Sequence, residues 1–156
     1  MKDYLKNLRK LIGNTPILIC GASVIVLNEN NEILLQLRED SNCWGYAGGS
    51  VDINEVVEDA AKRELLEETG LVATELELFG IFSGEALYHV YPNGDEISAV
   101  EIVYLCRDYT GVPQADMVET LKVRFFSIDA LPENLFTPNL PALQKLKEAL
   151  APSSNK

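Results

Sequence analysis

Three glutamates and one arginine stand within residues 63–70, which read RELLEETG. If this segment is helical, Glu64 and Glu68 lie one above the other on one face, with Glu67 beside them. Three like charges on a narrow arc repel each other, and a divalent cation with oxygen ligands would remove this repulsion. Two interpretations follow from the spacing. The acids either form a solvated helix surface, on which Arg63 pairs with Glu67, or they bind a metal ion.

The helix that carries these acids is expected over residues 54–69, with Asn54 as N-cap and Gly70 as stop signal. Its first turn would hold three acids, which are Glu55, Glu58 and Asp59. The face toward the core is marked by small or apolar residues: Val57, Ala60 and Ala61. Glu64 and Glu68 continue this face, so carboxylates are expected on a surface that points inward.

The formal net charge of −11 argues against a protein that binds nucleic acid through a broad basic surface. If the substrate is anionic, a bound cation would have to neutralise its charge locally. No apolar run is long enough to span a membrane, and the N-terminus lacks the apolar segment of a signal peptide. The widely spaced Cys20, Cys43 and Cys106 fit a reducing cytoplasm. We therefore expect a cytoplasmic protein with a small-molecule partner and neither a membrane nor a nucleic-acid partner, and a homodimer stays open.

The apolar periodicity predicts mostly strands, flanked by helices at both ends of the chain. A short amphipathic helix is expected over residues 3–12, and a last helix over 141–150 precedes a tail over 151–156. A strand buried on both faces is predicted over 17–27 and a strand paired with it over 32–38. Further strands are expected over 73–83, 85–91, 97–107 and 120–128, with a tight Asn-Gly turn at 93–94. These elements predict one domain over residues 1–156, an α/β sandwich whose mixed sheet is covered on both faces.

Residues 49–71 resemble the Nudix box. This motif consists of Gly, five residues, Glu, seven residues, Arg-Glu, an apolar residue, any residue, Glu-Glu, any residue, Gly and an apolar residue. Its defined positions are matched by Gly49, Glu55, Arg63, Glu64, Leu65, Glu67, Glu68, Gly70 and Leu71. Around the motif, Ala47 stands where many members have Pro, and Asn54 stands where many have Gly. Asp52 replaces a frequent Glu, which leaves any role of position 52 open. The resemblance implies a Nudix hydrolase with the α/β/α sandwich of that family, in which a mixed β-sheet lies between helices.

The resemblance also implies an activity and the residues that carry it. Nudix hydrolases typically hydrolyse a nucleoside diphosphate linked to another group, with Mg²⁺ or Mn²⁺ as cofactor and water attacking phosphorus. By resemblance the metal ligands are Glu64, Glu67 and Glu68, with the carbonyl group of Gly48 or Gly49 as a further ligand. Arg63 would orient Glu67 and its neighbours, and Glu55 would brace the junction of loop and helix. Glu67 and Arg63 are therefore expected to be catalytic.

Substrate recognition is expected outside the motif. Trp44 and Tyr46 precede the glycines in a polar loop and are predicted to bind the substrate. For the other aromatic residues two roles stay open, stacking on a base or packing in the core. These residues are Phe82, Tyr88, Tyr91 and Tyr104. His89 is left out of the catalytic set, because a single histidine in an alternating strand is usually packed or exposed.

An acid outside the motif is expected to complete the site, as a metal ligand or as general base. The candidates are Asp95, Glu96, Glu101 and Glu119. Turn chemistry alone explains Asp95, whereas Glu101 lies between apolar residues of a predicted strand. Glu119 is preferred, because it lies in a loop that could close over a bound diphosphate.

Two rival functions stay open. One is a different Nudix activity, such as hydrolysis of oxidised nucleoside triphosphates or removal of an RNA cap. The other is a Nudix-like module that senses a nucleotide without catalysis. Such a module would be expected to lose carboxylates of the motif, and all of them are present here.

Overall fold

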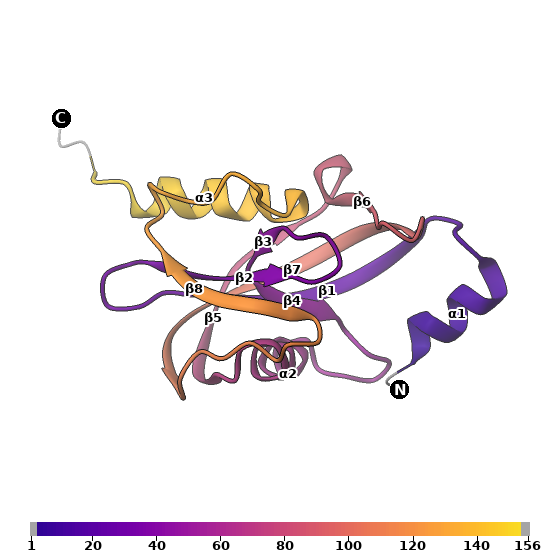
Figure 1. The fold of residues 1–156 in the computed structure, drawn as a ribbon, viewed down its shortest axis with the longest axis horizontal. Helices are drawn as coiled ribbons and strands as arrows, with labels where there is room; N and C mark the ends of the chain where they lie inside the picture. The colour runs from indigo at the N-terminus through magenta and orange to yellow at the C-terminus, as the bar shows by residue number, and fades with distance from the viewer. Residues whose placement is uncertain (1–2, 154–156) are drawn as a thin grey trace.

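The computed structural model describes residues 3–153, and its elements form three layers (Figure 1). Helix α2 (Val57–Thr69) covers one face of the β-strands, and helix α3 (Leu140–Leu150) covers the other. The predicted α/β/α sandwich is therefore confirmed. Its middle layer differs from the prediction in one respect, because it consists of two sheets instead of one mixed sheet.

The larger sheet has the order β4-β1-β7-β5, with β6 also paired to β7. Its strands are β1 (Ile17–Val26), β4 (Ala47–Ser50), β5 (Val72–Phe82), β6 (Tyr88–Val90) and β7 (Glu96–Thr110). Because β1 runs parallel to β7 and antiparallel to β4, this sheet is mixed. The second half of β1 is buried throughout, whereas residues 17–20 alternate between half-buried and exposed. The predicted burial on both faces is thus correct only for the second half.

The smaller sheet has the order β3-β2-β8 and consists of β2 (Ile33–Arg38), β3 (Trp44–Gly45) and β8 (Thr120–Phe126). The prediction that β2 pairs with β1 is wrong. β2 is antiparallel to β3 and β8, and within residues 3–153 one isolated bridge, from Leu27 to Ile33, joins it to the end of β1. Both strands are apolar on both faces, so their hydrophobic pattern did not specify which partner each would take.

The hairpin predicted at Asn93 and Gly94 is confirmed, since β6 pairs antiparallel with β7 and Gly94 has a φ of 88°. The strand predicted over residues 85–91 is partly wrong. Its first residues form a 3-10 turn, η1 (Glu85–Leu87), and only β6 is extended.

Helix α2 begins three residues later than predicted, and its N-cap is Val56 instead of Asn54. Asn54 has a φ of 65°, so it forms the left-handed turn that leads into the helix. Gly70 ends α2 as predicted, with a φ of 76° and its N–H donating to the carbonyl of Leu66.

Two apolar clusters hold the three layers together. The cluster under α2 includes Val24, Val26, Ala60, Ala61 and Leu65. The cluster under α3 includes Ile25, Ile33, Leu35, Leu143 and Leu146. Successive residues of β1 point to opposite clusters, because side chains alternate along a strand. This explains why its sequence is apolar without interruption.

The predicted first helix is confirmed as α1 (Tyr4–Ile12), which lies apart from the three layers in Figure 1. Arg9 attaches it to the body, because its guanidinium donates to the carbonyl groups of Thr15 and Glu96, both at 2.6 Å. The predicted last helix is α3, which begins at Leu140. Residues 154–156 of the predicted tail lie outside the described residues. That residues 1–156 form one domain stays a prediction.

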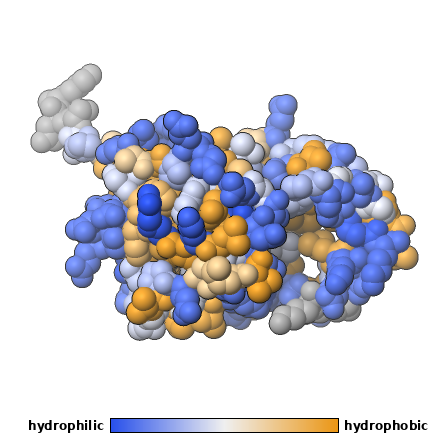
Figure 2. All heavy atoms as spheres, viewed as in Figure 1, coloured by the Kyte–Doolittle hydropathy of each residue, from blue (hydrophilic) through white to orange (hydrophobic). Residues whose placement is uncertain are grey.

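Figure 2 shows hydrophilic side chains over much of one face, with apolar side chains gathered across its centre. No helix among residues 3–153 is both long and apolar enough to cross a membrane. Cys20, Cys43 and Cys106 are free thiols.

Candidate active site

Four acids come together where α2 meets the loop before β8. Glu64 and Glu67 line a cavity with Glu119, and an adjoining cavity is lined by Glu68 and again by Glu119. We call the two together the carboxylate cavity. Helix α2 supplies three of its acids at the predicted spacing, and Glu119 comes from a segment about fifty residues later, just before β8. Four further acids line its edges: Asp3, Glu39, Asp40 and Asp52.

Asp116 holds the backbone around Glu119 in place. Its Oδ1 accepts hydrogen bonds from the N–H groups of Val118, Glu119 and Thr120, at 2.8, 3.0 and 2.9 Å. Burial acts to raise the pKa of Asp116, but these three donors outweigh it and the pKa is lowered. The Glu119 side chain is exposed, so an ordered backbone carries a carboxylate that is free to move.

Glu68 is the most buried acid of the carboxylate cavity, with 6% of its surface exposed. Its Oε2 accepts hydrogen bonds from Gln36 Nε2 at 2.6 Å and from the N–H of Gly48 at 3.1 Å. Burial, together with the neighbouring Glu64, raises the pKa of Glu68 to about 8 despite these donors. A cation in the cavity would favour the ionised form of this carboxyl group.

Arg63 ties α2 to the loop in front of it. Its Nε and Nη2 donate to the two oxygens of Glu55 at 2.7 and 2.9 Å, and its Nη1 donates to Glu64 at 2.7 Å. These bonds lower the pKa of Glu55 to about 2 and raise that of Arg63. Nη1 also donates to Glu67 Oε2 at 3.5 Å, so the expected pair with Glu67 is present, but Glu55 and Glu64 are the closer partners of Arg63.

Glu55 and the two glycines shape the entrance of the helix. Glu55 accepts the N–H of Asp52 at 2.9 Å, so it braces the junction of loop and helix. A Cβ on Gly49 would lie 2.5 Å from the carboxyl carbon of Glu64, and one on Gly48 would lie 2.0 Å from Ser23 Oγ. Only glycine therefore lets the backbone of β4 approach both α2 and β1 so closely.

The carboxylate cavity fits a hard divalent cation by the chemistry of its donors, because Mg²⁺ takes carboxylate oxygens as ligands. Among residues 3–153, however, no three acidic, histidine or cysteine side chains are gathered closely enough to hold a cation as they stand. Glu64 is paired with Arg63, and Glu68 with Gln36 and Gly48. Metal binding would therefore be accompanied by rotation of these side chains.

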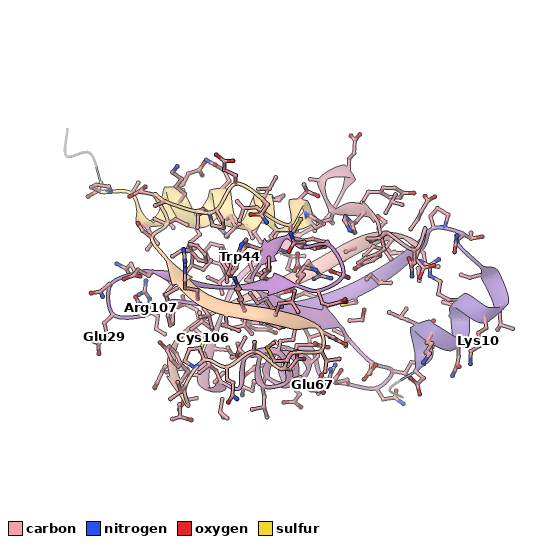
Figure 3. All side chains as sticks on the ribbon, viewed as in Figure 1. Lys10, Glu29, Trp44, Glu67, Cys106 and Arg107 are labelled. Carbon is pink, nitrogen blue, oxygen red and sulfur yellow. The ribbon has the colours of Figure 1, made fainter. Side chains whose placement is uncertain are left out.

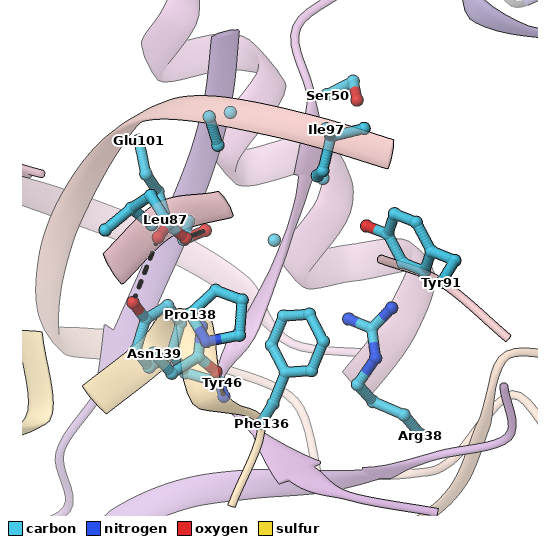
Figure 4. Close-up of a pocket in the computed structure, with 15 residues that line it drawn as sticks. Arg38, Tyr46, Ser50, Leu87, Tyr91, Ile97, Glu101, Phe136, Pro138 and Asn139 are labelled. Carbon is cyan, nitrogen blue, oxygen red and sulfur yellow. Dashed lines mark hydrogen bonds between the residues drawn. The ribbon is translucent and has the colours of Figure 1, made fainter. Parts of the chain in front are cut away.

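A second cavity lies on the larger sheet (Figure 4). Its floor consists of small residues of β1, β4 and β7: Gly21, Ser23, Gly48, Gly49, Ser50 and Ala99. Its walls include Tyr46, Tyr91, Phe136 and residues of η2 (Thr137–Asn139). We call it the aromatic cavity. Ser50 and Arg38 each line both this cavity and part of the carboxylate cavity, so the two are neighbours.

The two residues predicted to bind substrate have different surroundings. Tyr46 lines the aromatic cavity and its hydroxyl donates to Glu101 Oε2 at 3.4 Å. Trp44 is absent from the lining and packs edge-on against Phe126, with ring centroids 4.9 Å apart, in the cluster under α3 (Figure 3). Tyr46 lies between β3 and β4 and also packs in the cluster under α3, so the two residues differ in that Tyr46 reaches the aromatic cavity as well.

The remaining candidates are divided between the aromatic cavity and other places. Glu101 lies in the aromatic cavity, where Ser23 Oγ is 2.5 Å from its Oε1, and Tyr91 lines the same cavity. His89 packs edge-on against Tyr91 and Phe136. Asp95 stays at the hairpin near Arg9, and Glu96 accepts a hydrogen bond from Tyr88. Phe82 and Tyr104 pack against the apolar clusters.

Sequence reasoning missed three residues of the aromatic cavity, which are Arg38, Phe136 and Asn139. The Arg38 guanidinium lies 4.2 Å from the centroid of the Phe136 ring and donates to both oxygens of Asp40. Asn139 is 4% exposed, and its Oδ1 accepts the N–H of Tyr46 at 3.2 Å. Pro138 and Asn139 precede the last helix and are residue types that favour a helix start. No local sequence pattern indicated that residues of this segment would line a cavity.

The sandwich and the carboxylate cavity together define a Nudix protein. A family model described as "NUDIX domain" matches residues 19–146, which is more than half of the chain. The chain therefore belongs to the Nudix family. Helix α1 lies before the matched part.

Similar proteins include two enzymes with different names. A putative 8-oxo-dGTP diphosphatase from Bacillus subtilis (strain 168) is 50% identical over 62 residues, which cover 40% of this chain and 42% of that protein. An ADP-ribose pyrophosphatase from Methanocaldococcus jannaschii is 32% identical over 114 residues, which cover 71% of this chain and 63% of that protein. The matches thus span less than two thirds of either relative. The crystal structure of a MutT NUDIX hydrolase from Burkholderia pseudomallei is similar with a TM-score of 0.70 and 28% identity, over 83% of this chain and 98% of that one.

Proposed function

We propose that this protein hydrolyses a diphosphate linkage in a nucleoside diphosphate derivative, in a reaction that depends on Mg²⁺ or Mn²⁺. The observation that carries this proposal is the contact between the two cavities. A cavity rich in carboxyl groups adjoins a cavity with aromatic walls, and the glycines of β4 lie between them. A nucleoside in the aromatic cavity would thus extend its phosphates toward the acids of α2.

In this proposal Glu64, Glu67 and Glu68 hold the metal, with the carbonyl group of Gly49 as a further ligand. When bound, a divalent cation neutralises the diphosphate and stabilises the charge that develops on its oxygens. Arg63 orients Glu64 through their 2.7 Å hydrogen bond and anchors it to the loop through Glu55. Glu119 accepts the proton of the attacking water or supplies another ligand, since its exposed carboxylate borders both parts of the cavity.

The relatives suggest two substrate types for this chain, ADP-ribose and the oxidised nucleotide 8-oxo-dGTP. The box carboxylates are all present, which supports catalysis over a sensor that only binds nucleotide. The charge of −11 favours a small nucleotide over RNA.

The test is a screen of ADP-ribose, nucleotide sugars, NADH, dinucleoside polyphosphates, dNTPs and 8-oxo-dGTP with Mg²⁺, read by chromatographic separation of the nucleotide products. At least one substrate should be hydrolysed, and Glu67→Gln should lower kcat roughly a hundredfold on it, as expected for loss of a well-placed electrostatic group. Glu58→Gln is the matched control, because Glu58 lies on the same helix but is exposed and paired with Lys62. Equal rates for the Glu67 variant and the wild type would contradict the proposed active site.

A further inference from the structure

Glu101 stands out in the aromatic cavity as a buried acid that forms no ion pair with the described residues. It projects from β7, is 8% exposed, and is the only carboxyl group among the described residues that line this cavity. Its neighbours are hydroxyl groups, Ser23 Oγ at 2.5 Å from Oε1 and Tyr46 Oη at 3.4 Å from Oε2 (Figure 4). Such a position has no structural need for an acid, since apolar side chains would fill the same space at lower cost.

The one arginine that lines the aromatic cavity is engaged elsewhere. Arg38 donates to Asp40 Oδ1 at 3.0 Å and to Oδ2 at 2.7 Å, and its guanidinium lies over Phe136. Burial raises the pKa of Glu101 and outweighs the opposing effects of the Ser23 and Tyr46 hydrogen bonds and of the Arg38 charge, which shifts Glu101 toward the neutral acid. Hydroxyl groups can donate or accept, so Ser23 and Tyr46 are compatible with a neutral acid that keeps both a donor and an acceptor.

Small residues and aromatic side chains surround this acid. Gly21 is the β1 residue paired with Glu101, and a Cβ there would already lie 3.8 Å from the Glu101 side chain. Ala99, also on β7, is small, and Tyr91 and Phe136 supply aromatic surface on the walls. An aromatic heterocycle stacked in this cavity would present its polar edge to Glu101.

We propose that Glu101 recognises the hydrogen-bonding edge of the nucleobase, as a neutral acid that donates one hydrogen bond and accepts another. This inference rests on the proposed function, because it assigns the nucleoside end of the same substrate to the aromatic cavity. The best complement is an amino group beside a bare ring nitrogen, as in adenine and cytosine. The ring nitrogen accepts the acid proton, and the amino group donates to the carboxyl C=O. Hypoxanthine and uracil present a less basic carbonyl oxygen to the same proton, so they pair more weakly.

The test uses nucleoside 5′-monophosphates without divalent cation, so that binding is read independently of hydrolysis. Calorimetry should show AMP and CMP binding roughly tenfold tighter than IMP and UMP, because their ring nitrogen accepts the acid proton more strongly than a carbonyl oxygen does. Glu101→Gln keeps a donor and an acceptor and should retain this preference, whereas Glu101→Leu should abolish it. Glu96→Gln is the matched control, because Glu96 lies on the same strand and also bonds to a tyrosine hydroxyl, but outside the cavity.

Several results would overturn the inference. One is a Glu101→Gln variant that loses as much affinity as Glu101→Leu, because an ionised carboxylate would then be required. Another is GMP binding tightest, since its adjacent donors match a carboxylate. Ribose 5-phosphate binding as tightly as AMP would show that the base contributes nothing.

A protein that hydrolyses no substrate but keeps the AMP preference would contradict only the proposed reaction. A protein that hydrolyses a substrate but binds all four monophosphates equally would contradict only the role of Glu101.

Discussion

The carboxyl group of Glu68 is deeply buried, accepts hydrogen bonds from amide donors and forms no ion pair with the described residues. Its pKa of about 8 lies above the ordinary 4.5. Between these two values the folded protein binds a proton that the unfolded chain has lost, so stability falls as the pH rises. In the absence of metal we expect the free energy of unfolding to decrease by a few kcal/mol between about pH 5 and pH 8.

Urea denaturation in EDTA across this pH range measures the effect. Glu68→Gln should flatten the dependence, because glutamine has no proton to lose, whereas Glu58→Gln on the exposed side of α2 should leave it unchanged. An equally steep dependence in the Glu68 variant would mean that other groups cause it.

The proposed role of Glu119 depends on the tertiary structure, which brings this acid next to the acids of α2. If it accepts the proton of the attacking water, Glu119→Gln should lower kcat roughly a hundredfold or more and remove the acidic limb of the pH–rate profile. The measurement is kcat against pH at saturating Mg²⁺, with the exposed loop acid Glu133 changed to Gln as control. A profile of unchanged shape would assign the base to an acid of the Nudix box.

At the scale of elements, the close contact between β4 and β1 depends on Gly48. An added Cβ would lie 2.0 Å from Ser23 Oγ and 2.9 Å from the Ser23 backbone, so Gly48→Ala must push the strands apart. We expect a loss of about 1–3 kcal/mol in stability, as for other overpacked sites. Gly21→Ala is the control in the neighbouring strand, because its Cβ would meet nothing closer than 3.8 Å. Equal urea midpoints for the two variants would show that β4 can shift at little cost.

At the scale of the whole molecule, the net charge of −11 and the gathered carboxyl groups predict a protein that metal stabilises. A ligand that binds only the folded state adds RT ln(1 + [L]/Kd), about 2.7 kcal/mol at a hundredfold excess over Kd. For a chain of this size, Tm should rise by roughly 5 to 10 °C with excess Mg²⁺ or Mn²⁺. NaCl at matched ionic strength separates this effect from general screening of the charge. A Tm that Mg²⁺ raises no more than NaCl does would contradict the metal site.

The sequence alone determined the local features of this protein. The helical period placed Glu64, Glu67 and Glu68 on one side of α2, Gly70 ended that helix, and the turn at Gly94 formed the predicted hairpin. The sandwich also followed, because apolar strands must be covered on both faces. These features depend on residues within a few positions of one another, or on a motif that occupies 23 consecutive residues.

Tertiary structure alone decided which distant segments meet. β2 was assigned to the wrong strand, Trp44 lies under α3 instead of in a cavity, and Arg63 is bonded to Glu55 more closely than to Glu67. The aromatic cavity brings Arg38, Glu101 and Asn139 together from three separate parts of the chain. An apolar strand can pair with many other strands equally well. The residues next to a polar side chain in the sequence do not indicate where that side chain will be buried. Only the packing of all layers at once selects one pairing, and with it the residues that face the substrate.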